Sequence, residues 1–341
     1  MSVVATVFCG HTGDADSSSV PTPLPLGERV GEEPALRDPP ETQLAYNEHF
    51  ELLESVEPTV KQLLEEHRAR RKPWYFHDLI PWELGRNFKT EPWDESQATL
   101  NERARTSLVL NLLTEDNLPY YHVTLERYLP EGSIWREWNN LWTAEEGQHA
   151  IAIRSYLLTS RNCDPYELED DRMATMTAGW EPRWDHPAEL FAYTSAQELA
   201  TRVSHRNAGK ITDDETAYEL MKHIASDENH HFLFYKGVMT KMLEDHPEAA
   251  LEGILNTFSN FQMPGTGIPG YLRRSIEIAR AGVYNLRIHH DNVLSPLITQ
   301  WGIDRLTGIS TRAQELQDRI MALPAEIIAK AERFEARFAT T

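Results

Sequence analysis

Two Glu-x-x-His motifs are the residues of this chain with the clearest potential for chemistry. One consists of Glu146 and His149, and the other of Glu228 and His231. Residues three apart share a face of an α-helix, so each motif can offer a carboxylate and an imidazole to one metal ion. A single motif is weak evidence, because so short a pattern also arises by chance. The context that the two motifs share is stronger evidence.

Each motif follows another glutamate at almost the same distance. Glu115 lies 31 residues before Glu146. Glu198 lies 30 residues before Glu228. This distance fits half a helix, a turn and half of the returning helix, which would bring each glutamate level with its motif. The repeat predicts a four-helix bundle with four carboxylates and two imidazoles at mid-height, as in ferritin-like di-iron and di-manganese proteins.

Charge balance favours a pair of divalent metal ions at this position. Four carboxylates and two divalent cations are neutral together, whereas four unpaired buried carboxylates would be prohibitively costly. A set of oxygen and imidazole ligands suits iron or manganese better than a metal that prefers thiolates.

The residues beside the motifs have predicted roles as well. Glu145 and Asp227 stand directly before Glu146 and Glu228, where each can accept a hydrogen bond from a ligand histidine. His230 is about 200° round the helix from Glu228 and should face away, so His231 is the expected ligand.

Hydrophobic periodicity predicts an all-α protein built on a ferritin-like four-helix bundle with additional helices. Apolar residues recur at helical spacing from about residue 44. We expect a connection rich in Trp and Pro at 73–98, and helices at about 99–128, 133–160, 187–208, 213–243, 270–298 and 310–338, the last on the surface. Residues 1–43 contain six prolines and a serine run, which predicts a disordered extension. Residues 44–341 are expected to form one domain.

Composition excludes several classes of function. The chain has 33 Lys and Arg against 53 Asp and Glu, a net charge of −20, which argues against nucleic-acid binding. It contains no apolar run that could span a membrane. The two cysteines cannot form a disulfide framework, which favours a cytoplasmic protein.

Four segments around these glutamates and histidines resemble the ligand helices of soluble acyl-(acyl-carrier-protein) desaturases of the stearoyl 9-desaturase type. They are LTEDNLP (113–119), WTAEEGQH (142–149), YTSAQELAT (193–201) and ASDENHH (225–231). Residues 261–264 and 302–310 resemble further family stretches, and residues 287–291 resemble the actinobacterial branch. The resemblance covers about residues 47–338.

The resemblance implies an O₂-dependent enzyme that introduces a cis double bond into a fatty acyl chain held on acyl-carrier protein. It implies two Fe²⁺ ions per chain, with Glu115 and His149 on one and Glu198 and His231 on the other. Glu146 and Glu228 would bridge the two ions. A ferredoxin-like electron donor and a homodimer are also implied.

The resemblance assigns roles to three further residues. Trp74 and Asp227 match an electron path that reaches the site through His149, and Thr201 matches a threonine involved in handling oxygen and protons. The simpler interpretations are an ordinary packed tryptophan and a hydroxyl bonded to its own helix. Leu112, Tyr120, Met221, Phe232 and Met263 could line an acyl channel, but ordinary core packing is the favoured interpretation of each.

Two departures from the family pattern bear on activity. Gly147 and Gln148 stand where the family usually has Asn and Arg, and glycine weakens a helix interior. Ala196 replaces a bulky aromatic residue, which predicts a changed pocket wall.

The sequence leaves alternatives open for the surface that docks partner proteins and for the function. Acidic partners would need a basic surface, for which residues 68–72 and Arg273, Arg274 and Arg280 are candidates. The alternative functions are another di-iron oxygenase (a hydroxylase or N-oxygenase), a catalytically weak paralogue, and an iron-binding protein.

Overall fold

The computed structural model describes residues 40–182 and 184–338, and every regular element within them is helical. The predicted disordered extension lies outside the described residues up to residue 39. Residues 40–43 belong to the first described helix, α2 (Pro40–Arg70).

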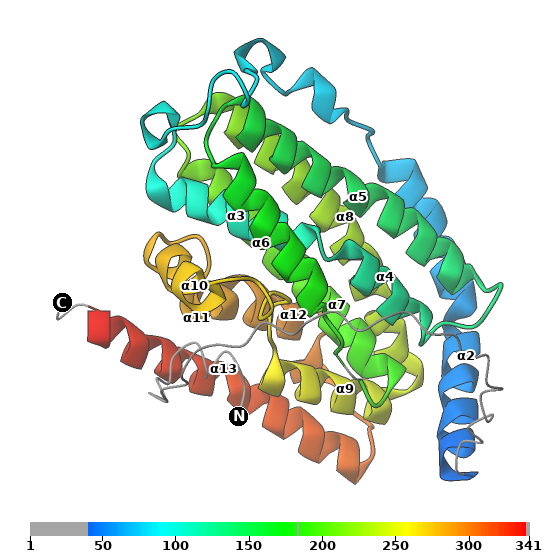
Figure 1. Cartoon of the computed structure of the whole chain (residues 1–341). Coiled ribbons are helices and arrows are strands. Elements are labelled where there is room, and N and C mark those ends of the chain that lie inside the picture. Colours follow the sequence, from blue (N-terminus) through cyan, green and yellow to red (C-terminus); the bar gives the residue numbers. More distant parts are fainter. Residues whose placement is uncertain (1–39, 183, 339–341) are drawn as a thin grey trace, which may run out of the picture.

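Four helices form a bundle around the predicted metal ligands (Figure 1). They are α3 (Glu102–Glu115), α5 (Ile134–Thr159), α7 (Pro187–Lys210) and α8 (Glu215–Asp245). α3 contacts α5 and α7, and α8 contacts the same two helices, so the four close a ring. The predicted fold class, a ferritin-like bundle with additional helices, is confirmed.

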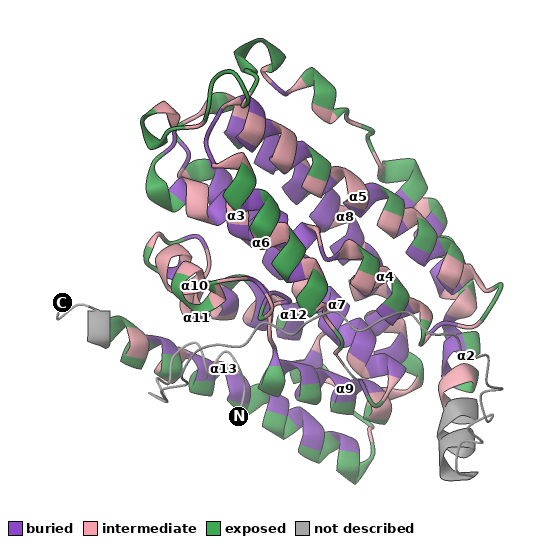
Figure 2. Cartoon of the chain, in the orientation of Figure 1, coloured by how far each residue is buried: buried purple, intermediate pink, exposed green. Residues whose placement is uncertain are grey.

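The helix α2 packs on the outside of this bundle against α5 and α8. Its residues Leu52, Val56, Val60 and Leu64 are almost completely buried, as expected from their spacing. Figure 2 shows the same division into buried and exposed faces along the other helices. The connection that follows contains only the short elements η1 (Phe76–Asp78), η2 (Trp82–Leu84) and η3 (Glu95–Gln97).

The predicted helix at 99–128 is in fact two helices. α3 ends at Glu115, and α4 (Leu118–Glu126) begins after two intervening residues. Pro119 lies in the first turn of α4, where its missing N–H leaves no carbonyl without a partner. Glu115 therefore belongs to the last turn of its helix.

The prediction of one helix at 270–298 is also wrong. α10 (Tyr271–Arg280) ends before Gly282, whose φ of +71° suits glycine at a helix end. Asn285 then caps α11 (Leu286–His289), and a π-helical turn η4 (His290–Leu294) leads into α12 (Ser295–Gln300).

The remaining helices lie around the bundle. α6 (Pro165–Ala178) and α9 (Pro247–Asn260) were not predicted, and each begins with a proline. η5 (Ile303–Arg305) precedes α13 (Thr311–Phe338), which packs against α9 (Figure 1). α13 is not wholly a surface helix, because Leu316, Ile320 and Ile327 belong to the main hydrophobic core. No helix among the described residues is long and apolar enough to cross a membrane.

Candidate metal centre and adjoining cavity

The fold brings all six predicted metal ligands together in the middle of the bundle. Each is at most 7% exposed. One group comprises Glu115, Glu146, His149 and Glu228, and the other Glu146, Glu198, Glu228 and His231. Within each group the potential ligand atoms lie within 4.8 Å of one another. Glu146 and Glu228 belong to both groups, which is the arrangement that a pair of bridged metal ions requires.

The cluster fits a metal pair because its inward-facing atoms face other members of the cluster. Oε1 of Glu146, Oε2 of Glu198 and Nδ1 of both His149 and His231 make no hydrogen bond of good geometry. Nδ1 of His231 lies 2.7 Å from Oε1 of Glu146, and Nδ1 of His149 lies 3.1 Å from Oε2 of Glu146. Such a convergent set of buried oxygens and imidazole nitrogens can hold metal ions, and it suits iron or manganese.

The outward nitrogens of both histidines are held as predicted. Nε2 of His149 lies 3.4 Å from Oδ2 of Asp227. Nε2 of His231 donates to Oε2 of Glu145 at 3.0 Å. These contacts turn each Nδ1 towards the cluster, which is how residues outside a metal centre orient histidine ligands.

Glu145 is itself held by two residues of α2. His67 lies 2.9 Å from Oε2 of Glu145, and Nε of Arg71 lies 2.6 Å from its other oxygen. Burial raises the pKa of Glu145, but the hydrogen bonds from His231 and His67 outweigh burial and leave the pKa below its usual range. The carboxylate is thus ionised where it faces His231.

Trp74 connects the cluster to the outside of the bundle. Its Nε1 donates to Oδ2 of Asp227 at 2.7 Å, and the same oxygen faces His149. Trp74 is partly exposed and stacks on His223, with ring centroids 5.2 Å apart. The structure therefore contains a continuous set of contacts from Trp74 to a ligand histidine.

Thr201 contacts both the cluster and its own helix. Its Oγ1 lies 2.8 Å from Oε2 of Glu228 and 3.0 Å from the carbonyl oxygen of Glu198. The geometry therefore fits both interpretations of Thr201, a hydroxyl bonded to its own helix and a hydroxyl in contact with the cluster.

Two residues in contact with the cluster were not predicted. Nε1 of Trp142 donates to Oε1 of Glu198 at 2.9 Å. Nε2 of His205 lies 3.1 Å from Glu115 and 3.2 Å from Glu228. His205 lies two helical turns after Glu198, a spacing that keeps a residue on the same helix face and could have identified it.

Burial and neighbouring charges shift the pKa values of the clustered side chains. Burial raises the pKa of Glu198 well above its usual range, and the charge of Glu228 adds to this. Burial lowers the pKa of His149, but Glu146 and the hydrogen bonds to nearby carboxylates raise it well above its usual value.

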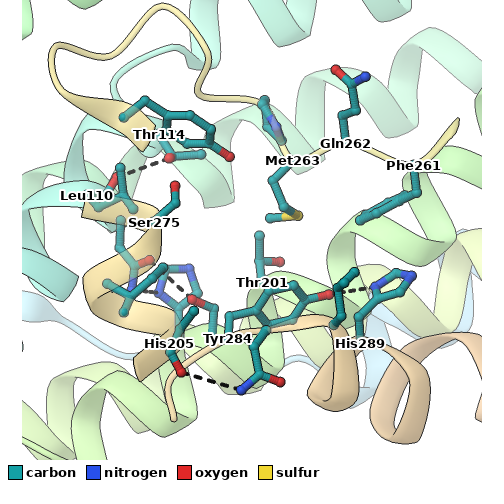
Figure 3. A pocket seen from close by; sticks show the side chains of 18 of the residues that line it. Leu110, Thr114, Thr201, His205, Phe261, Gln262, Met263, Ser275, Tyr284 and His289 are labelled. Atoms are coloured by element: carbon teal, nitrogen blue, oxygen red, sulfur yellow. Dashed lines mark hydrogen bonds between the residues drawn. The ribbon is translucent and has the colours of Figure 1, made fainter. Parts of the chain in front are cut away.

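A mostly apolar cavity of about 120 Å³ meets the cluster between α3, α7, α10 and α11 (Figure 3). Leu110, Phe261, Met263 and Tyr284 contribute to its walls. The lining also includes Glu115, Thr201 and His205, so the cavity extends to the candidate ligands.

Most of the predicted channel residues lie elsewhere. Only Met263 of the five candidates lines the cavity. Leu112, Met221 and Phe232 are core residues, and the hydroxyl of Tyr120 donates to the carbonyl of Met176. Ala196 is fully buried in the main core and also lies outside the cavity lining.

Gly147 does not interrupt the helix that carries its two ligands. α5 is continuous, and a Cβ at Gly147 would meet only Leu118 Cδ2, at 3.8 Å. We expect Gly147→Ala to raise the free energy of unfolding by about 1 kcal/mol, because alanine is the better helix former. Thermal or urea unfolding measures this.

Gly253 provides the contrast for that substitution. It is also inside a helix, but a Cβ there would lie 2.6 Å from backbone atoms of Ala188 and Glu189. Gly253→Ala should therefore destabilise the protein. Equal effects of the two substitutions would contradict this account of α5.

Three comparisons relate this geometry to known proteins. Residues 48–341 match the model of the fatty acid desaturase family. An acyl-[acyl-carrier-protein] desaturase of Mycobacterium tuberculosis, DesA1, is 38% identical over 297 residues, 84% of this chain and 88% of that protein. The chloroplastic stearoyl-[acyl-carrier-protein] 9-desaturase of Ricinus communis is 29% identical over 295 residues, 78% of this chain and 72% of that protein.

A solved structure agrees with the fold as well. The X-ray structure of the acyl-ACP desaturase DesA2 from Mycobacterium tuberculosis matches with a TM-score of 0.64 and 25% identity. The match covers 78% of this chain and 98% of that chain.

Proposed function

This chain belongs to the fatty acid desaturase family, and we propose that it introduces a cis double bond into a fatty acyl chain carried on acyl-carrier protein. The observation that carries the proposal is an apolar cavity that ends on a buried cluster of four glutamates and two histidines. An acyl chain has no polar handle, so a narrow apolar cavity has to decide which carbons reach the cluster.

In this proposal the cluster holds two iron ions. Glu115 and His149 bind one ion and Glu198 and His231 the other, while Glu146 and Glu228 are shared. The bound iron pair supplies the oxidising power, using O₂ and two electrons, that removal of two hydrogens from adjacent methylenes requires. Donor atoms within 4.8 Å of one another in two overlapping groups support the assignment.

The protein residues position the substrate and exclude water. The walls formed by Leu110, Phe261 and Met263 replace water around the acyl chain. Thr201 holds its hydroxyl 2.8 Å from Glu228 on the cavity side, where it can pass a proton to or from the cluster.

We infer that electrons enter through Trp74, Asp227 and His149. The hydrogen bond of 2.7 Å between Trp74 and Asp227 and the contact of 3.4 Å to His149 support this route. The donor in the proposal is a ferredoxin-like protein, and the active unit is a homodimer.

An acidic electron donor needs a basic surface on this acidic chain. The arginines of the cluster at 68–72 already contact carboxylates: Arg68 pairs with Glu137, Arg70 with Glu66 and Arg71 with Glu145. Arg274 pairs with Asp171. Four arginines of the two candidate clusters are therefore already paired with carboxylates.

The groove between α7 and α8 is better suited to an acidic partner. Arg202, Arg206 and Lys222 line it, and its lining includes no acidic residue, although Lys222 pairs with Glu219 beside the groove. Burial and the adjacent Arg206 lower the pKa of Arg202, and neither arginine has an ion-pair partner among the described residues. Lys222 is next to His223, which stacks on Trp74, so one docked protein could cover both the groove and the proposed electron entrance.

A charge reversal tests this docking surface. We expect Arg202→Glu/Arg206→Glu to raise the KM for a ferredoxin donor roughly tenfold and to weaken its dependence on salt. Single turnover driven by a chemical reductant should be unchanged. The matched control, Arg305→Glu/Arg312→Glu, changes the charge equally at exposed positions beside α13. A rise in the KM for acyl-carrier protein, or equal effects of the two variants, would contradict this docking surface.

Mass spectrometry of the acyl product tests the function. The iron-loaded protein, given O₂, a reductant and acyl-carrier protein with a saturated chain, should yield a product lighter by two hydrogens. A product heavier by one oxygen atom would instead identify a hydroxylase. An unchanged substrate beside an active desaturase control would support the catalytically weak paralogue.

A further inference from the structure

His205 connects two of the candidate ligands with a single imidazole nitrogen. Its Nε2 lies 3.1 Å from Oε1 of Glu115 and 3.2 Å from Oε1 of Glu228. The side chain is 1% exposed and comes from α7, whereas the two glutamates come from α3 and α8. One residue therefore links three of the four bundle helices at the level of the cluster.

The ring of His205 is held from its other side. The amide nitrogen of Asn111 lies 3.3 Å from Nδ1 of His205, and the hydroxyl of Ser204 donates to the amide oxygen of Asn111 at 3.3 Å. With Nδ1 accepting from Asn111, Nε2 carries the hydrogen and can donate to the carboxylates. His205, Asn111 and Ser204 line the cavity, and Figure 3 shows His205 at its edge.

The two shared carboxylates are held by different kinds of residue. Both oxygens of Glu228 have protein partners on the cavity side, His205 on Oε1 and Thr201 on Oε2. The oxygens of Glu146 face the two candidate ligand histidines, with Oε1 2.7 Å from Nδ1 of His231 and Oε2 3.1 Å from Nδ1 of His149. Glu228 is therefore fixed by residues outside the candidate ligand set, whereas Glu146 faces members of that set.

We propose that His205 is a positioning residue that fixes Glu115 and Glu228, so that metal binding beside Glu115 and His149 depends on it more than binding beside Glu198 and His231. Glu198 takes its hydrogen bond from Trp142 and is independent of His205. The identity of the metal pair rests on the proposed function.

Metal binding, measured without any substrate, tests the role of His205. The metal-depleted chain is titrated anaerobically with Mn²⁺, and its EPR spectrum is recorded at two equivalents. We expect wild type to bind both ions and to give the spectrum of a spin-coupled pair. In His205→Ala one of the two affinities should fall by about 10–100-fold, the usual effect of losing a hydrogen bond to a metal ligand, and isolated Mn²⁺ should appear.

A conservative variant separates this role from a structural one. The amide nitrogen of glutamine can occupy the position of Nε2, so His205→Gln should restore most of the affinity and the coupled spectrum. His122→Ala, a half-buried histidine on α4 that contacts Thr143 and lies outside the ligand groups, should bind as wild type.

Three results would overturn the proposal. They are two unchanged affinities in His205→Ala, an equal loss of both affinities, and a glutamine variant as weak as the alanine variant. The result does not depend on desaturation. If wild type made no unsaturated product but the binding pattern held, the proposed function would fail while the role of His205 stood.

Discussion

Glu146→Gln is expected to abolish product formation, lowering it by at least about 10³-fold. Glu146 belongs to both groups of candidate ligand atoms, and its two oxygens lie 2.7 Å from Nδ1 of His231 and 3.1 Å from Nδ1 of His149. Glutamine keeps the size of the side chain but removes the charge and the second ligand oxygen that a bridge requires. The measurement is acyl product by mass spectrometry beside bound metal per chain.

The matched control for this substitution is Glu137→Gln on the same helix. Glu137 is exposed and pairs with Arg68. It should retain wild-type activity and metal content, apart from a stability change below about 1 kcal/mol. An active Glu146→Gln variant with two bound metal ions would contradict the assignment of Glu146 as a bridging ligand.

Removal of the metal is expected to produce a large loss of thermal stability. Ions that bind only the folded chain stabilise it by about 4 kcal/mol when their free concentration is about 1,000 times the dissociation constant. For a domain of this size that corresponds to a fall of roughly 10 °C in Tm. Calorimetry with and without a chelator measures this difference.

The physical reason is the group of carboxylates that remains when the metal leaves. The four carboxylates, Glu115, Glu146, Glu198 and Glu228, are each at most 7% exposed. Burial raises the pKa of Glu198 well above its usual range. Glu146→Gln, which lacks a complete site, should show little change on chelation. A wild-type Tm that is indifferent to chelation would indicate that the cluster holds no metal.

The sequence was sufficient to bring the six candidate ligands together, because their geometry follows from helical periodicity. Three residues separate Glu146 from His149, and the same spacing relates Glu228 to His231, so each pair shares a face of a continuous helix. The contacts of Asp227 and Glu145 with the ligand histidines follow from the same register.

The sequence alone was insufficient for the cavity wall and for the contacts of His205, because both depend on tertiary packing. The cavity wall depends on how α10 packs on α3, and α10 and α11 were predicted as one long helix. Of the five residues considered for a channel wall, only Met263 lines the cavity, and Leu112, Met221 and Phe232 are core residues, which was the favoured interpretation; Phe261 and Tyr284 were missed. His205 reaches glutamates on two other helices, a contact that no local spacing specifies.

The net charge of −20 likewise supports one prediction from the sequence and leaves another to the tertiary structure. As a total it argues against nucleic acid as a partner, but it does not locate a docking surface. In the densest basic segment, residues 68–72, Arg71 forms an ion pair with the buried Glu145. Arg202 and Arg206 are four residues apart, and they line one groove only because α7 and α8 pack together.

Anomalous diffraction at the iron absorption edge, from crystals of the iron-loaded chain, tests the central claim most directly. The account predicts two peaks within the bundle, each within bonding distance of both Glu146 and Glu228. One peak should also contact Glu115 and His149, and the other Glu198 and His231. A single peak, or iron bound only outside these six residues, would contradict the proposed metal pair.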